Sequence, residues 1–240
     1  MLPKFRLFAG PNGSGKTSLF EYLRADGVIH TEFYINADRF EREIKSNLSF
    51  NFNAYRVKVS ESEFVGFIKS SSLFDKISDK SFINHLSINS GILRFDLHQE
   101  KISSYHASFL ASYLAEKLFD TEQSFCFETV MSHESKIDLL KAATSKGYKT
   151  YLYFVYTDSP ELNVARVKLR ALMGLHDVTE GLIKSRYIRS FDLLPKALQI
   201  VDRAYLINNS DTFKVVAEKQ ADELFIKEPI SDYLKGLLNA

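Results

Sequence analysis

Short apolar runs alternate with longer amphipathic stretches along much of the chain, and this alternation predicts an α/β fold. The runs are short and rich in aromatic and β-branched residues, so each is predicted to be a buried strand; they lie at Phe5–Ala9, Glu32–Ala37, Ser124–Phe127, Lys149–Tyr156 and Arg203–Asn208. The stretches between them have apolar residues at helical spacing and therefore predict helices.

The clearest predicted helix covers Ser104–Phe119, where five apolar side chains share one face: Phe109, Leu110, Tyr113, Leu114 and Leu118. Local signals place further helices. Ser132 is predicted to cap a helix over Glu134–Lys146, and Ser159-Pro160-Glu161 opens a helix in the favoured order of cap and then proline. The tail from Thr212 is predicted to be helical and peripheral.

Residues 45–103 differ from the rest, because they are rich in Ser, Asn and Phe and show no obvious core strand. Ser60-x-x-Glu63 is a capping-box pattern ahead of apolar residues at roughly helical spacing. We expect a mainly helical insertion within a single domain that spans 1–240. Two interpretations stay open: the insertion covers the edge of the sheet, or it forms one wall of an acceptor pocket.

The charge balance narrows the possible partners. The chain has 31 basic and 30 acidic residues, a net charge of +1, which disfavours bulk attraction to nucleic acid or to an anionic membrane. Cys126 is the sole cysteine, so no internal disulfide can form, which fits a reducing cytoplasm. Residues 1–10 lack a signal-peptide pattern, and no run approaches 18 apolar residues. We therefore expect a cytoplasmic protein.

One motif gives this fold a specific chemistry. Gly10-Pro11-Asn12-Gly13-Ser14-Gly15-Lys16-Thr17 fits the phosphate-binding pattern G-x-x-x-x-G-K-[ST] and lies between a predicted strand and a predicted helix. The glycines let backbone N–H groups approach a polyphosphate, and the following helix points its positive end at the same place. Lys16 is predicted to reach the β- and γ-phosphates, Thr17 to bind Mg²⁺, and Ser18 to belong to the same nucleotide site.

Two carboxylates are predicted to lie at the carboxyl ends of strands, where open α/β sheets bind their ligands. Asp38 follows the second strand and is placed to accept a proton from a substrate hydroxyl, or it is simply the N-cap of the next helix. Glu128 follows the strand at 124–127 and is placed beside Mg²⁺ or the phosphates, or it is paired with a lysine at the end of the sheet.

A cluster of positive residues lies between 160 and 190 and predicts a lid-like segment. Arg166 and Arg170 are four apart, hence on one helical face, and Arg186 and Arg189 follow a glycine-containing turn that includes His176. Each charge by itself is typical of a solvated helix face. Together they favour phosphoryl transfer, which needs positive groups around the transferring phosphate.

The last strand ends at Asn208, and the loop that follows it is rich in polar residues. Such a loop at a strand end can hold the base of a nucleotide, so Asn208 is a candidate nucleotide contact. The same residues are also ordinary turn formers.

The chain resembles the zeta-toxin family of phosphate-loop kinases. The resemblance rests on residues 8–17, on Asn36-Ala37-Asp38, on Phe127-Glu128-Thr129 and on the stretch 159–190, and it covers about residues 4–40 and 104–210. The chain departs from the family pattern at two places. His176 lies where the family has an arginine, and residues 45–103 do not match the known sugar-nucleotide pocket.

The resemblance implies a phosphate-loop fold with a parallel five-stranded core flanked by helices, ATP or GTP with Mg²⁺, and transfer of the γ-phosphate to a hydroxyl. Characterised members phosphorylate UDP-activated amino sugars, and some are toxins held in check by a small helical antitoxin. By resemblance, Asp38 is the general base, and Arg166 or Arg170 is the lid arginine that contacts phosphate.

These observations predict a cytoplasmic ATP-dependent kinase, in which Lys16, Asp38, Arg166 and Arg170 act in catalysis. Two alternatives stay open. One is a kinase of another small molecule or of a nucleotide. The other is a nucleotide-binding switch or regulator with slow ATPase activity. Asp38 and the arginine cluster favour a kinase, because a pure switch needs no base that faces an acceptor.

Overall fold

The computed structural model describes residues 2–172 and 178–238. The chain forms two compact units, one made of Met1–Tyr34 with Ser124–Ala240 and the other of Ile35–Gln123. The predicted insertion at 45–103 lies inside the second unit, which also takes in the helices before and after it. Among the described residues, no helix has both the length and the apolar character needed to cross a membrane.

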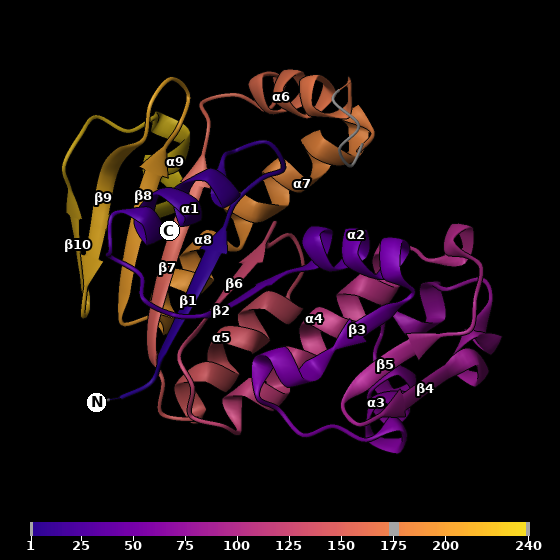
Figure 1. Ribbon diagram of the computed structural model, residues 1–240. Coiled ribbons are helices and arrows are strands. Elements are labelled where there is room, and N and C mark those ends of the chain that lie inside the picture. The colour runs from indigo at the N-terminus through magenta and orange to yellow at the C-terminus, as the bar shows by residue number, and fades with distance from the viewer. Residues whose placement is uncertain (1, 173–177, 239–240) are drawn as a thin grey trace. The chain divides into compact units, whose positions relative to one another are not determined.

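A seven-stranded sheet forms the centre of the first unit (Figure 1). Its strand order is β2 (Phe33–Asn36), β6 (Phe125–Thr129), β1 (Lys4–Ala9), β7 (Lys149–Tyr156), β8 (Arg203–Asn208), β9 (Lys214–Gln220) and β10 (Glu223–Ile226). The strands from β6 through β8 pair in parallel. The first five strands in this order are the five predicted from the sequence, so the predicted α/β fold with a mostly parallel sheet is confirmed.

The last two strands correct the prediction for the tail. Residues after Thr212 were expected to be helical, but β9 and β10 form an antiparallel hairpin on β8, and among the described residues of the tail only α9 (Asp232–Leu238) is helical. The reason lies in the residues themselves: β-branched and aromatic side chains at Val215, Val216 and Phe225 favour strands over helix.

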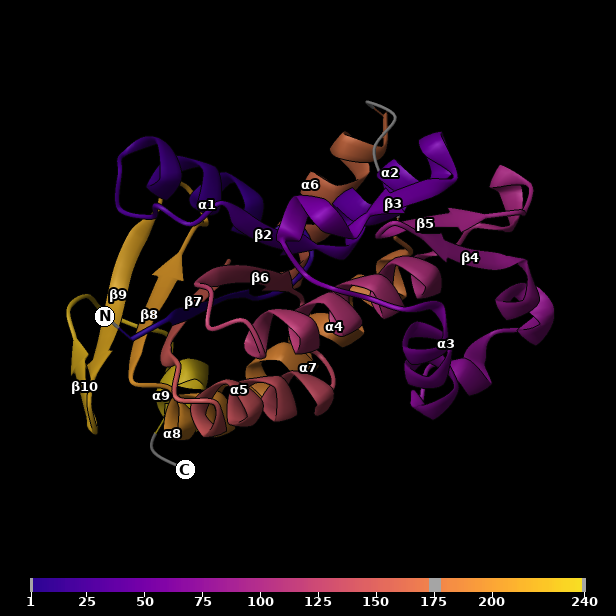
Figure 2. The same ribbon diagram turned by 60° about the horizontal axis from the view of Figure 1, so that its bottom comes forward.

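Helices cover both faces of this sheet, as its continuous apolar strands require. Figure 2 shows α1 (Lys16–Ala25) on one face and α5 (Ser135–Ser145) with α8 (Leu194–Ile200) on the other. The helix after β6 begins later than predicted, because Glu134 rather than Ser132 is its N-cap residue. The His133 ring accepts a hydrogen bond from the Ser135 backbone N–H, which holds a turn before the helix.

The lid-like segment predicted at 160–190 contains two helices. These are α6 (Pro160–Leu172) and α7 (Glu180–Asp192), which pack together through Val164, Val167 and Ile183. The predicted helix start at Ser159-Pro160-Glu161 is confirmed. His176 lies outside the described residues.

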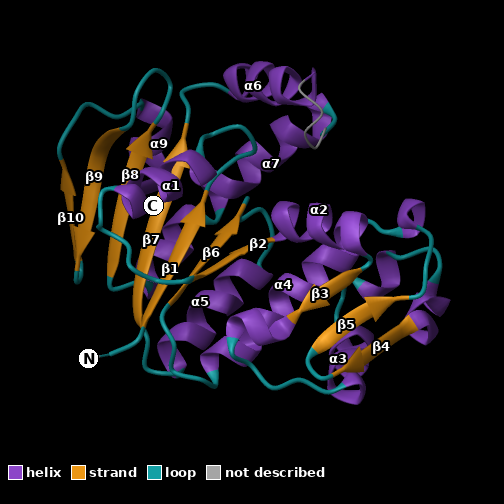
Figure 3. Ribbon diagram, in the orientation of Figure 1, coloured by secondary structure: helices purple, strands orange, loops and turns teal. Residues whose placement is uncertain are grey.

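The second unit combines helices with a small sheet (Figure 3). Its helices are α2 (Ala37–Asn47), α3 (Glu61–Ser70) and α4 (Ser104–Phe119), joined by four short 3₁₀ turns at 52–55, 74–76, 80–85 and 99–101. The capping box at Ser60 and Glu63 is present, and α4 has the predicted bounds. The sheet was not predicted: β3 (Ser49–Asn51), β5 (Ile92–Phe95) and β4 (Leu86–Asn89) pair antiparallel in that order. Strands of three or four residues are too short to show an alternating pattern.

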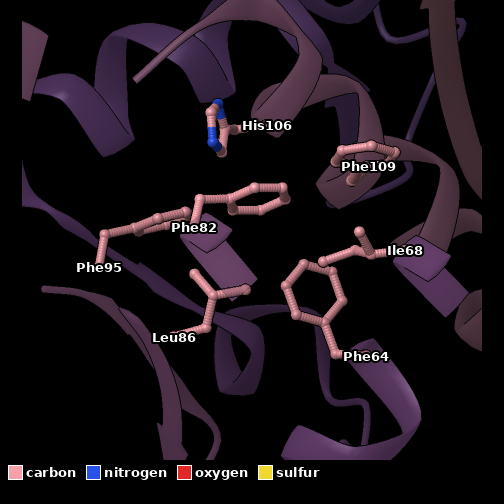
Figure 4. Close-up of a pocket in the computed structure, with 7 residues that line it drawn as sticks. All are labelled: Phe64, Ile68, Phe82, Leu86, Phe95, His106 and Phe109. Atoms are coloured by element: carbon pink, nitrogen blue, oxygen red, sulfur yellow. The ribbon is translucent and has the colours of Figure 1, made fainter. Parts of the chain in front are cut away.

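Aromatic packing holds this unit together. Figure 4 shows Phe64, Phe82, Phe95 and Phe109 around a small pocket, which His106 closes from α4. The His106 ring is buried and lies edge-on against Phe82, with 4.6 Å between the ring centroids. Its Nδ1 accepts the Ser103 backbone N–H, so Nε2 carries the proton, and Nε2 has no partner among the described residues.

Candidate active site

The phosphate-binding loop lies between β1 and α1, and its three glycines all have positive φ angles, 135° at Gly10, 75° at Gly13 and 98° at Gly15. The space on their outer side is filled by protein. A Cβ at Gly10 would lie 1.9 Å from the Val155 carbonyl oxygen, and one at Gly13 would lie 2.7 Å from the Asn163 carbonyl oxygen. The glycines are therefore needed for close packing of the loop against β7 and α6, as well as for its turn.

Polar groups of this loop are buried and suited to a polyphosphate. Lys16 is buried, and its Nζ donates to the Pro11 carbonyl 2.8 Å away, across the loop. The hydroxyl of Ser14 is fully buried and has no partner among the described residues, so it is a donor without an acceptor. Pro11 and Asn12 are buried as well, and Ser18 is exposed in the first turn of α1. An anionic ligand would supply the acceptor that the Ser14 hydroxyl lacks among the described residues.

The second group of the site lies where β6 ends. The Thr17 hydroxyl donates to the Glu128 carboxylate, with distances of 2.9 and 3.0 Å to its two oxygens. The Tyr34 hydroxyl, from β2, donates to Oε2 of the same carboxylate. Glu128 is half-buried and is held by hydroxyls, and within residues 2–172 and 178–238 no lysine is paired with it. The predicted closeness of Thr17 and Glu128 is therefore observed, while Tyr34 was missed by sequence reasoning.

Helix α6 is hydrogen-bonded to the phosphate-binding loop by a residue that the sequence analysis did not select. Asn163 is fully buried; its Nδ2 donates to the Asn12 carbonyl, and its Oδ1 accepts the Thr157 hydroxyl. A buried asparagine on the inner face of an amphipathic helix was the available signal, because such a side chain needs partners.

The two arginines of α6 have different surroundings. Arg166 is half-buried, and its guanidinium donates to the carbonyls of Asn209 at 2.7 Å and Ser210 at 3.0 Å. Arg170, one turn further on, is exposed. Arg186, on α7, is half-buried. Direct contact of any of them with a phosphate stays a prediction.

The loop after β8 is built around Asn208. Its side chain donates to Asp158 at 2.7 Å and accepts from the Ser210 backbone N–H at 2.8 Å. The next residue, Asn209, donates from its side chain to the Ser14 carbonyl at 2.8 Å. Asn208 therefore stabilises the loop after β8, and Asn209 joins that loop to the phosphate-binding loop. Contact of Asn208 with a nucleotide base remains a prediction.

Asp38 lies in the second unit, in the first turn of α2. The N-cap of that helix is Asn36, whose side chain accepts the Arg39 backbone N–H at 3.1 Å. The interpretation of Asp38 as the N-cap is therefore wrong. Its side chain is exposed, so it is available to a ligand.

The fold and the site together define the class of proteins with a P-loop fold: a mostly parallel sheet, a G-x-x-x-x-G-K-T loop after its first strand, and a threonine–carboxylate pair beside that loop. Within this class, the chain belongs to the zeta toxin family, whose sequence model matches residues 95–227. The matched range contains Glu128 and the segment 160–190, and the phosphate-binding loop precedes it.

Solved structures share this fold. The AvrRxo1-ORF1:AvrRxo1-ORF2 complex with sulphate ions matches with a TM-score of 0.60 and 14% identity, covering 99% of this chain and 64% of that one. The same complex with ATP matches at 0.57 and 13%, with the same coverage. The PezAT chromosomal toxin–antitoxin system of Streptococcus pneumoniae matches at 0.55 and 16%, covering 100% of this chain and 83% of that one. At these identities the likeness shows the fold alone.

A curated relative matches this chain over a short stretch. An uncharacterized protein of Haemophilus influenzae is 33% identical over 63 residues, which make up 26% of this chain and 45% of that protein. The match thus spans less than half of that relative, and this chain spans less than two thirds of the AvrRxo1 chain.

Proposed function

We propose that this protein is an ATP-dependent kinase that transfers the γ-phosphate to a hydroxyl group of a small molecule. The observation that carries the proposal is the Thr17–Glu128 pair, 2.9 Å apart, next to a phosphate-binding loop whose lysine is buried. A loop that only turned the chain would not need a carboxylate held against its threonine. Membership of the zeta toxin family supports the same reaction class.

A nucleotide fits the residues present, because the loop buries the Lys16 ammonium, and because the buried Ser14 hydroxyl has no acceptor in the part of the chain that the structure describes. Mg²⁺ fits the oxygen donors of Thr17 and Glu128, since this ion is usually held by one or two protein oxygens together with phosphates and water. When bound, Mg²⁺ neutralises charge on the phosphates. GTP fits the same loop, since the loop motif recognises phosphates rather than the base.

The other residues take roles that follow from their chemistry. Lys16 contacts the β- and γ-phosphates, and Arg170, which is exposed on α6, neutralises charge as the phosphoryl group transfers. Arg166 supports the loop at 209–210 through two carbonyls. Asp38, exposed and not needed as a helix cap, orients and deprotonates the acceptor hydroxyl.

We propose a UDP-activated amino sugar as the first acceptor to test, and a small helical antitoxin as a candidate partner. The support is the family match and the fold shared with a toxin–antitoxin system of Streptococcus pneumoniae. A cytoplasmic location is part of the same proposal, supported by the free, buried thiol of Cys126.

Two other functions remain as candidates. One is a kinase of another acceptor such as a nucleotide, and the other is a nucleotide-binding switch with slow ATPase activity. Arg166 favours the switch, because it joins α6 to the loop at 209–210 and so provides a way to transmit nucleotide binding.

The test is ADP release from ATP in the presence of a panel of acceptors. Sugar nucleotides, nucleosides and nucleotides are added one at a time, with buffer alone as the baseline. Our proposal predicts that at least one hydroxyl-bearing acceptor stimulates ADP release well above the baseline. Equal release with every acceptor and with water would favour the switch.

A further inference from the structure

The carboxylate at the end of β6 is held from two sides. Thr17, on α1, donates its hydroxyl to Glu128, and Tyr34, on β2, donates its hydroxyl to the same group. β2 is the neighbour of β6 in the sheet, so Tyr34 reaches Glu128 from the adjacent strand. Two hydroxyl donors converge on one carboxylate and restrict its orientation.

The Tyr34 ring is itself fixed. It is buried and stacks on Phe20, with 3.8 Å between ring centroids and 4° between ring planes. Phe20 lies three residues after Thr17, so both face the same side of α1. Helix α1 therefore supplies one hydroxyl to Glu128 and also holds the ring that supplies the other.

We propose that Tyr34 is a positioning residue for the metal site: its hydroxyl orients Glu128 so that this carboxylate and Thr17 present oxygens to a nucleotide-bound Mg²⁺. This inference rests on the proposed function. The hydroxyl of Tyr34 is hydrogen-bonded to Glu128 and acts through that carboxylate. It acts as the outer partner of a metal-ligating carboxylate, and the loss of such a partner typically costs 10- to 100-fold in metal affinity.

The chain beyond Tyr34 adds a consequence. Asn36-Ala37-Asp38 follows directly, so the strand that fixes Glu128 is also the strand that leads to the proposed general base.

The experiment uses Tyr34→Phe, which removes the hydroxyl and keeps the ring stacked on Phe20. ADP binding is measured by titration calorimetry, once with EDTA and once with saturating Mg²⁺. The dissociation constant in EDTA divided by the dissociation constant in Mg²⁺ reports how much the metal strengthens ADP binding. We expect this ratio to fall about tenfold in Tyr34→Phe, with the dissociation constant in EDTA unchanged.

Two further variants serve as controls for this measurement. Tyr22→Phe makes the same change at an exposed tyrosine of α1 and should leave the ratio unchanged. In a Glu128→Gln background, adding Tyr34→Phe should cause no further loss, because the carboxylate that it orients is already gone.

Several results would overturn the inference. One is an unchanged ratio in Tyr34→Phe. Another is an equal weakening of ADP binding with and without Mg²⁺, which would mark Tyr34 as a structural residue. If the unaltered protein bound no ADP in either condition, the proposed function would fail first, and the inference with it.

Discussion

At the scale of single residues, Lys16 tests whether the loop binds a nucleotide at all. Its ammonium is buried in the loop, and our proposal gives it a charge-assisted contact with a bound phosphate. We expect Lys16→Ala to weaken ATP binding and to remove turnover while the fold survives. Calorimetric titration with ATP and Mg²⁺, together with a circular dichroism spectrum, checks both points. Unchanged affinity and turnover would remove the loop from the mechanism.

Asp38 separates catalysis from structure. Because Asn36 is the N-cap of α2, replacing Asp38 removes no cap. We expect Asp38→Asn to keep the melting temperature within a few degrees, to bind ATP normally and to lose about 10²- to 10⁴-fold in phosphoryl transfer. By contrast, Asn36→Ala should lower stability by about 0.5–2 kcal/mol. Near-normal transfer by Asp38→Asn would leave that carboxylate without a catalytic role.

At the scale of elements, the two arginines of helix α6 differ in their surroundings. Arg166 bonds the loop at 209–210, whereas Arg170 is exposed. We expect Arg170→Ala to lower kcat far more than it raises the KM for ATP, because its charge acts mainly in the transition state. Arg166→Ala should chiefly raise that KM. Steady-state kinetics measure both, with Arg24→Ala on α1 as the control, and full kcat in Arg170→Ala would assign that arginine to ground-state binding.

Helix α4 carries a buried histidine, His106, from which we expect the second unit to lose stability in acid. Burial lowers the pKa of His106 below its usual 6.5, against smaller opposing effects of the Ser103 backbone and the Glu41 charge. The unfolded chain therefore binds the proton more readily, so this contribution to stability is complete above pH 6.5 and is lost as the pH falls below it, by up to about 1.4 kcal/mol per pH unit.

Thermal melts at pH 7, 6 and 5 check this expectation. His106→Gln can keep the capping box and should flatten the difference between pH 7 and pH 5 relative to the unaltered protein. His85→Gln, at an exposed position, should not change it. A pH profile that is the same in His106→Gln and in the unaltered protein would contradict this account.

The elements that were predicted well are those whose signal is local and strong. Strand 149–156 and helix 104–119 are long, and the phosphate-binding loop has a fixed pattern, so each was predicted from its own residues. The strands β3, β4 and β5 were missed because they are short, and because β3 pairs with a strand far along the chain, with Ser49 opposite Arg94. Tyr34 and Asn163 were missed for a related reason: their roles depend on partners 94 and 151 residues away.

At the scale of the whole molecule, two independent lines agree. The family match covers 95–227, and the phosphate-binding loop lies outside that range. The loop was identified from its pattern and from the strand and helix around it, yet the hydrogen bond from Thr17 joins it to Glu128, within the matched range. The loop pattern and the family match come from different parts of the chain, and both indicate the same kind of site. This agreement favours a phosphotransferase over a loop that binds nothing.

The fate of the γ-phosphate tests the central claim most directly. The protein is incubated with ATP, Mg²⁺ and an acceptor that stimulates turnover, and the products are followed by ³¹P NMR. A kinase predicts a new phosphomonoester signal that grows in step with ADP and is absent in Asp38→Asn. Inorganic phosphate as the sole new product, formed at the same rate with and without acceptor, would contradict the account.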